Sequence, residues 1–176
     1  MGPRLGVIYS SENIITKEEL AIKGDKEAFV YLINEHRLSL YRIAKGILKD
    51  DYKVEDAISN TIIKAFENIK KLKKAEYFKT WLIRILINEC NLTLKKEKRI
   101  LYLEDSVKEE AYIDLYENID LINAIETLDD DLKLVTILYY FEDIDQKEIA
   151  KIISVKESTV RTKLFRARKK LYEILK

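Results

Sequence analysis

Glycine and proline are scarce in this chain, which has four glycines and one proline among its 176 residues. Neither residue occurs between positions 47 and 176. Strand-rich folds need frequent tight turns, which rely on Gly, Pro, Asn and Asp, so this scarcity predicts an all-α fold. It also leaves no glycine-rich loop to hold a phosphate, which argues against an enzyme that hydrolyses nucleotides.

Cysteine and histidine are equally rare. The single cysteine, Cys90, excludes an internal disulfide, and nothing in the sequence calls for an oxidising compartment. His36 is the only histidine, so paired Cys or His ligands for zinc do not exist. His36 lies in a helical stretch, and we expect it on the surface or at the edge of the core. We therefore predict no metal, no cofactor and no catalytic residue.

Long hydrophobic runs are absent as well. The first residues, MGPRLGVIYSSEN, contain an apolar patch that is too short for a secretory signal, and no later segment approaches the ~20 apolar residues of a membrane span. We expect a soluble cytoplasmic protein without membrane insertion. Residues 1–15 match no pattern to which we assign a role.

Charge is nearly balanced overall, with 32 Lys and Arg against 31 Asp and Glu, but it is unevenly distributed. Residues 67–99 hold ten bases and four acids, residues 104–131 hold eleven acids and one base, and residues 145–176 again hold ten bases and four acids. Two basic blocks around an acidic one indicate a polyanion that is bound at two places. The alternative is that these blocks are ordinary solvated helix faces.

Apolar residues recur at helical spacing, which predicts helices joined by short loops. The expected helices cover residues 17–23, 25–48, 54–69, 78–99, 119–128, 130–141, 145–153 and 157–175. Residues 100–118 are acidic, rich in Tyr and weakly periodic. We interpret them as a flexible acidic linker between two small helical domains, residues 17–99 and 119–176.

The segment EIAKIISVKESTVRTKLFRARKKL, residues 148–171, has the pattern of a helix-turn-helix. Asp145 and Glu148 have the spacing of a capping box, and the turn is expected at 154–157. The apolar stripe of the second helix is expected at Val160, Leu164, Ala167, Leu171 and Ile174. A helix-turn-helix leaves the start of its second helix free to enter a major groove. The alternative is a helical hairpin with a basic solvent face.

The second helix of this motif supplies two sets of candidate DNA contacts. Side chains near its start are expected to face base edges: Glu157, Ser158, Thr159, Arg161, Thr162 and Phe165. Four cations further along are suited to phosphates: Lys163, Arg166, Lys169 and Lys170.

Two separate motifs resemble one known family. Residues 127–171, TLDDDLKLVTILYYFEDIDQKEIAKIISVKESTVRTKLFRARKKL, are similar to the promoter-reading C-terminal domain of extracytoplasmic-function sigma factors, the small bacterial initiation factors. Upstream, DDYKVEDAISNTIIKAFENI resembles their polymerase-binding helix, and FKTWLIRILINECNLTLKKEKR resembles the helix that follows it. The order and spacing of the motifs fit the family, which implies two helical domains on a flexible linker.

The resemblance also implies a role for each basic block. The C-terminal helix-turn-helix would read the duplex promoter element near position −35. The N-terminal domain would bind core RNA polymerase through one side of the 54–66 helix, and the resemblance implies these contacts there: Glu55, Asp56, Ser59, Asn60 and Ile63. The opened strand at the −10 element would be held by Lys73, Lys74, Tyr77, Thr80, Arg84, Asn88, Asn91 and Lys95. We expect Trp81 to pack in the core.

The resemblance further implies three partners: core RNA polymerase, promoter DNA and an anti-sigma protein. This chain departs from the family at Ser154, where Gly is common in the turn, at Lys156, where a small hydroxyl residue is common, and at Ser59, where Gln is common. Two other interpretations remain at this point. One is a regulator that binds duplex DNA without polymerase, and the other is a helical adaptor that binds only protein.

Overall fold

The computed structural model describes residues 15–101 and 119–176, and every regular element in these ranges is helical. The predicted all-α class is therefore confirmed. Residues 1–14, and the predicted linker from residue 102 onward, lie outside the described residues. Within the described ranges, no helix is both long and apolar enough to cross a bilayer.

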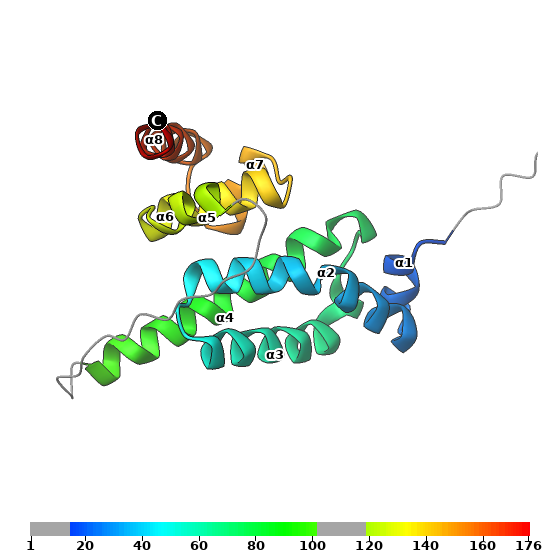
Figure 1. Cartoon of the computed structure of the whole chain (residues 1–176). Helices are drawn as coiled ribbons and strands as arrows, with labels where there is room; N and C mark the ends of the chain where they lie inside the picture. Colours follow the sequence, from blue (N-terminus) through cyan, green and yellow to red (C-terminus); the bar gives the residue numbers. More distant parts are fainter. Residues whose placement is uncertain (1–14, 102–118) are drawn as a thin grey trace, which may run out of the picture.

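The N-terminal unit contains four α-helices: α1 (Lys17–Ile22), α2 (Lys26–Ile47), α3 (Asp51–Asn68) and α4 (Phe78–Leu101). Two single 3₁₀ turns, η1 (Ile69–Lys71) and η2 (Ala75–Tyr77), connect α3 to α4. Figure 1 shows α2, α3 and α4 packed side by side, with α1 at one end. Their apolar stripes meet in a core in which Leu40, Val54 and Leu86 are almost completely buried.

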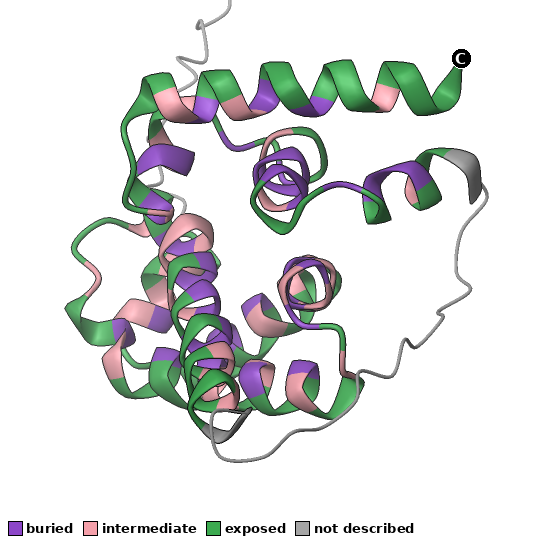
Figure 2. Cartoon of the chain, turned by 90° about the vertical axis from the view of Figure 1, so that its left-hand side faces the viewer, coloured by how far each residue is buried: buried purple, intermediate pink, exposed green. Residues whose placement is uncertain are grey.

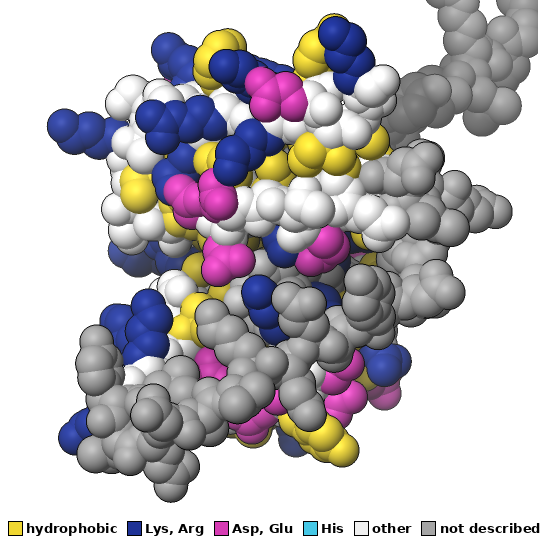
Figure 3. Space-filling view, turned by 60° about the vertical axis from the view of Figure 1, so that its left-hand side comes forward, with side chains coloured by type: hydrophobic (Ala, Val, Ile, Leu, Met, Phe, Trp, Pro, Cys, Tyr) yellow, Lys and Arg dark blue, Asp and Glu magenta, His cyan; other side chains and the backbone are white. Residues whose placement is uncertain are grey.

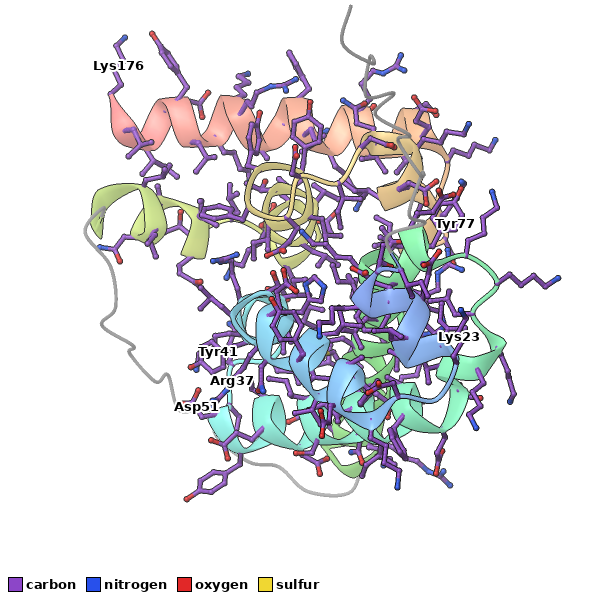
Figure 4. All side chains as sticks on the ribbon, turned by 90° about the vertical axis from the view of Figure 1, so that its right-hand side faces the viewer. Lys23, Arg37, Tyr41, Asp51, Tyr77 and Lys176 are labelled. Atoms are coloured by element: carbon purple, nitrogen blue, oxygen red, sulfur yellow. The ribbon has the colours of Figure 1, made fainter. Side chains whose placement is uncertain are left out.

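Side chains at the helix starts explain where these helices begin. Asp25 and Asp50 cap α2 and α3 by accepting hydrogen bonds from the backbone N–H groups of Ala28 and Lys53. Thr16 and Glu19 form a complete capping box at α1. At the other end of α2, Tyr41 and Lys45 both bond to Asp51, and Figure 4 shows Tyr41 beside Asp51.

The C-terminal unit contains α5 (Ile119–Glu126), α6 (Asp130–Thr136), η3 (Ile137–Phe141), α7 (Gln146–Ile152) and α8 (Glu157–Leu175). The predicted helix 130–141 is thus α helical only to Thr136 and continues as the π-helical segment η3. On α8 the predicted core residues Val160, Leu164 and Ala167 are buried, but Ile174 is 49% exposed. The predicted apolar stripe was wrong at Ile174, which lies in the last turn of α8 and is not covered by another helix.

The predicted capping box at α7 is only half formed. Asp145 accepts a hydrogen bond from the backbone N–H of Glu148 at 2.8 Å, as expected. The Glu148 carboxylate, however, does not return to the cap and instead pairs with Lys151 one turn along the helix. A lysine at i+3 competes for the carboxylate, and sequence spacing alone does not show which partner it takes.

The two units pack directly against each other. Helix α2 contacts α6 and η3, and α4 contacts α7. Leu40, Ile43 and Ala44 of α2 belong to the same buried cluster as Ile137 and Leu138 of η3. In Figure 2 the buried residues accordingly lie on the sides of the helices that face one another, within and between the units.

Candidate nucleic-acid interfaces

The helix-turn-helix consists of α7, a short turn and α8. Ser154 in the turn has a φ of 57°, in the left-handed region, and the next residue, Val155, donates its N–H to the carbonyl oxygen of Ala150 at 2.9 Å. Helix α8 packs on α5, α6 and α7 through its buried stripe. The opposite side of α8 is therefore open to solvent along its length (Figure 2).

Most of the predicted DNA contacts lie on this open side of α8. The exposed ones are Glu157, Ser158, Arg161, Thr162, Phe165, Arg166, Lys169 and Lys170, whereas Thr159 and Lys163 are half-buried. Phe165 is 63% exposed, which is unusual for so large an apolar side chain and is consistent with a contact surface. Figure 3 shows Lys and Arg side chains gathered on the outer side of this unit.

Two of the predicted phosphate ligands already have carboxylate partners. Lys170 pairs with Asp129 at 2.6 Å, and Lys163 pairs with Asp131. The hydrogen bond from Lys163 holds the pKa of Asp131 below its usual value. Both aspartates lie at the start of α6, so their carboxylates fix α6 against α8. Arg166 and Lys169 show no such pairing within the described residues.

A groove of about 540 Å³ lies between the end of α3, η1 and α4. It has apolar, amide and cationic side chains on its walls. The lining residues are Lys64, Asn68, Lys71, Leu72, Lys73, Trp81, Ile85, Asn88, Glu89 and Leu92. Leu92 is 45% exposed on this wall, although it is a large apolar side chain.

Two of the predicted −10 contacts, Lys73 and Asn88, line this groove. Trp81 packs against the core, as predicted, and its ring centroid is 6.0 Å from that of Phe78, but Trp81 also forms part of the groove wall. The sequence interpretation did not name Lys64, Asn68 or Lys71 as contacts. Lys71 lies in the first basic block, residues 67–99, and its charge was a signal that could have identified it. Lys64 and Asn68 on α3 had no comparable signal.

The other predicted −10 contacts lie outside the groove. Lys74 is exposed and its Nζ is 5.6 Å from the ring centroid of Tyr77. Thr80 is half-buried and donates a hydrogen bond to the Tyr77 carbonyl oxygen at 3.2 Å. Three more residues are exposed along α4: Arg84, Asn91 and Lys95.

The predicted polymerase contacts share the outer side of α3. Their i, i+1, i+4, i+5, i+8 spacing places them together, opposite a buried stripe that includes Val54 and Ala57. Glu55, Asp56, Ser59 and Ile63 are exposed, and Asn60 is half-buried. The amide of Asn60 donates to the Asp56 carboxylate at 3.1 Å, so this part of the surface is internally ordered. Ile63 is 56% exposed and provides an apolar centre.

The sequence and fold are similar to known sigma factors. Residues 32–100 match the Sigma-70 region 2 family and residues 119–171 match the Sigma-70, region 4 family. The RNA polymerase sigma factor SigV of Bacillus subtilis is 31% identical over 147 residues, which cover 82% of this chain and 89% of that protein. The ECF RNA polymerase sigma factor SigW of the same organism is 26% identical, over 88% of this chain and 92% of SigW.

Two solved structures have the same fold. The sigma factor RpoE of Bartonella quintana, in complex with the anti-sigma factor NepR, aligns with a TM-score of 0.75 at 23% identity, covering 85% of this chain and 97% of that chain. CnrH, in complex with the cytosolic domain of CnrY, aligns with a TM-score of 0.63 at 22% identity, covering 90% of this chain and 94% of that chain.

Proposed function

The chain belongs to the extracytoplasmic-function sigma factors, and from this premise we propose how its surfaces divide the work of transcription initiation. As a sigma factor it directs core RNA polymerase to specific promoters and assists strand opening. The N-terminal unit, residues 17–99, binds the polymerase and the −10 element, and the C-terminal unit, residues 119–176, binds the −35 element. The polymerase carries out the chemistry, and this chain contributes binding energy.

Helix α8 reads the −35 duplex. The proposal is supported by its open face, on which Arg161 and Arg166 project beside the exposed ring of Phe165. Arginine matches the acceptor pair of guanine in the major groove, and an apolar ring fits a thymine methyl group. Lys169 extends the same face toward the phosphates. Lys163 and Lys170 contribute less, because Asp131 and Asp129 already neutralise them.

The groove beside α4 holds the opened strand at the −10 element. Trp81, Ile85 and Leu92 offer apolar surface against which an unstacked base can pack. The side-chain amide of Asn88 can both donate and accept hydrogen bonds at the edge of a base. The ammonium group of Lys73, which also lines the groove, can pair with the backbone phosphates. This combination in one groove is the observation on which the strand-opening role rests.

The outer face of α3 binds core RNA polymerase. Two features of this face support the proposal. The side chain of Ile63 is exposed and forms an apolar centre, and the exposed carboxylates of Glu55 and Asp56 form a charged rim beside it, as in protein–protein interfaces. We also propose an anti-sigma protein as a partner, because RpoE and CnrH were each solved with a bound protein partner.

The −35 assignment is tested with purified chain and duplex −35 DNA. Arg161→Ala and Arg166→Ala are each expected to lower affinity about tenfold, and binding should weaken steeply with added salt. Lys170→Ala is the matched control and should have a smaller effect, because Lys170 pairs with Asp129 of α6 at 2.6 Å, whereas the contact of Arg161 with Glu157 in its own helix is longer, at 3.3 Å. All three variants should still co-purify with core polymerase. Loss of polymerase association in the arginine variants would contradict the division of roles.

The −10 assignment is tested with a single-stranded −10 oligonucleotide in the presence of core polymerase. Asn88→Ala should lower affinity by roughly fivefold or more, because a base-edge contact is lost. Asn34→Ala, an exposed asparagine on α2 that does not line the groove and is not a predicted DNA contact, is the control and should bind nearly as the wild type does. A chain that binds duplex DNA but never core polymerase would instead be the polymerase-independent regulator.

A further inference from the structure

An acidic side chain lies in the groove beside α4, where the opened strand is proposed to bind. Among the described residues that line this groove, three are lysines and one, Glu89, is an acid. A carboxylate repels phosphate, so Glu89 weakens the attraction that the lysines exert on a polyanion. General attraction to the DNA backbone therefore does not account for Glu89.

The carboxylate of Glu89 is set deep in the wall of the groove, and its side chain is only 10% exposed. Its Oε1 atom pairs with Nζ of Lys64 on α3 at 2.5 Å. Every fully buried side-chain oxygen in the described residues has a hydrogen-bond partner. Oε2 of Glu89 has no partner among those residues, so it reaches the surface of the groove and can accept a hydrogen bond there.

Neighbouring side chains make this part of the groove suitable for the edge of a base. Ile85, one turn before Glu89 on α4, offers apolar surface against which a base can pack. The amide of Asn88, the residue before Glu89, can donate to a ring nitrogen or a carbonyl oxygen. A carboxylate can only accept, and Glu typically accepts from the exocyclic amino group of cytosine. Thymine has a carbonyl oxygen in that place, which a carboxylate repels.

The same carboxylate directs the backbone of the strand to another part of the groove. Lys71 and Lys73 are exposed, whereas the ammonium group of Lys64 is already paired with Glu89. Phosphates are therefore attracted to Lys71 and Lys73 and repelled from Glu89. This charge arrangement favours a strand that turns its bases toward Glu89.

We infer that Glu89 is a specificity-determining residue of the −10 site, which accepts a hydrogen bond from a base with an exocyclic amino group and discriminates against thymine. This inference rests on the proposed function of the groove, and it adds the class of base that one position of the strand requires. Lys64 holds Oε1, so Oε2 is the atom that Glu89 presents to the base. The carboxylate also lowers the affinity for single strands in general, because it repels their backbone.

Selection from randomised single strands tests this role. The full-length chain and core polymerase are mixed with oligonucleotides randomised over the −10 element, and the bound fraction is sequenced. The wild type should deplete thymine about tenfold at one position, as expected for a hydrogen bond to a charged group. Glu89→Gln should abolish this depletion, because an amide can donate to thymine as well as accept from an amino group. The same variant should bind more of the total oligonucleotide, because it no longer repels phosphate.

Lys64→Gln is the companion variant. It removes the cation but keeps a donor for Oε1 of Glu89, so thymine depletion should persist while total binding falls. An ion pair that only joined α3 to α4 would leave the base preference unchanged in both variants. In Glu89→Gln the ammonium group of Lys64 is released, so the slope of log K against log salt should steepen by about 0.7, the value for one phosphate contact in a single strand.

The control is Glu35→Gln, which removes one exposed negative charge from α2, away from the groove. It should change neither the base preference nor the salt slope. Circular dichroism shows whether each variant folds. If Glu89→Gln folds poorly, Glu89→Asp keeps the charge but withdraws the carboxylate by one methylene group, and it should weaken the depletion of thymine.

Two results would overturn the role of Glu89. One is full depletion of thymine in folded Glu89→Gln or Glu89→Asp, and the other is a wild type that accepts thymine at every position as readily as the other bases. Both leave the binding of single strands in the groove intact. Failure of the wild type to bind any oligonucleotide in the presence of core polymerase would instead contradict the proposed −10 function.

Discussion

Gly46 of α2 lies directly against Ile137 of η3, so closely that a Cβ added to Gly46 would stand 2.6 Å from Cδ1 of Ile137. Real Cβ atoms essentially never approach a neighbour this closely. Both residues are buried, Ile137 with only 4% of its surface exposed. The absence of a side chain at Gly46 therefore allows the two units to meet at this distance.

Gly46→Ala is expected to weaken the contact between the units, although alanine favours the helix by about 1 kcal/mol. The new methyl group must displace Cδ1 of Ile137 from its packed position, which lowers the free energy of unfolding measured by urea unfolding followed by circular dichroism. Ile137→Val removes Cδ1, so Gly46→Ala should cost less stability in the Ile137→Val background than in the wild type. An equal effect of Gly46→Ala in both backgrounds would contradict the close packing at Gly46.

Asp131→Asn should strengthen non-specific DNA binding. The substitution releases the ammonium group of Lys163 from its ion pair, which makes one more cation available to the phosphates. The slope of log K against log salt should then steepen by about 0.9, the value for one added phosphate contact. Fluorescence anisotropy with duplex DNA over a range of salt concentrations measures this slope.

The control for this experiment is Asp130→Asn. Asp130 occupies the same first turn of α6 and is exposed, and it pairs with no cation in the described part of the chain. Both substitutions remove one negative charge near α8, so a general electrostatic effect would change the two slopes equally. Only release of Lys163 predicts a larger change for Asp131→Asn.

Ser154→Gly should stabilise the protein by roughly 0.5 to 1 kcal/mol. Ser154 has a φ of 57°, and this left-handed conformation costs an L residue about 1–2 kcal/mol. Glycine avoids this cost in the folded state, but it also gives the unfolded chain more conformational entropy, which offsets part of the gain. Urea unfolding followed by circular dichroism measures the change. Ser158→Gly, inside the first turn of α8, is the comparison and should destabilise the protein.

His36 should make the stability of the protein depend on pH in the acid range. Burial is the main cause that lowers the pKa of His36 from 6.5, and Lys79 acts in the same direction, while Glu35, Glu142 and Glu18 oppose it. The unfolded chain therefore binds a proton more readily than the folded chain. The stabilisation is fully present above the unfolded pKa and is lost as pH falls through 6.5 toward the lowered folded pKa.

The measurement compares urea midpoints at about pH 7.5 and about pH 5.5 for wild type and His36→Gln. Glutamine does not titrate in this range, so the variant should lose less stability than wild type on acidification. The titration of the carboxylates is common to both proteins and cancels in the comparison. Identical losses would mean that the His36 pKa is not lowered.

The sequence was sufficient to predict most of the helices and the faces they bury. Helix starts at Asp25 and Asp145, the buried stripe of α8 and the exposed set around Arg161 follow from patterns only a few residues long. The start of α3 at Asp51 lies three residues before the predicted one. Such patterns act through local hydrogen bonds and the 3.6-residue period, and both can be read without knowledge of the fold.

The interface between the units and the groove beside α4 were decided only by the tertiary structure. Glu142 contacts partners that are 63 to 103 residues away in the sequence, and no local pattern marks it as buried. Two further features depend on which helices pack together. Lys163 and Lys170 of α8 find carboxylate partners because α6 packs on α8, and Leu92 is exposed because it lines the groove beside α4. Propensity and periodicity act over one or two helical turns, whereas these contacts form only when distant helices pack in one particular register.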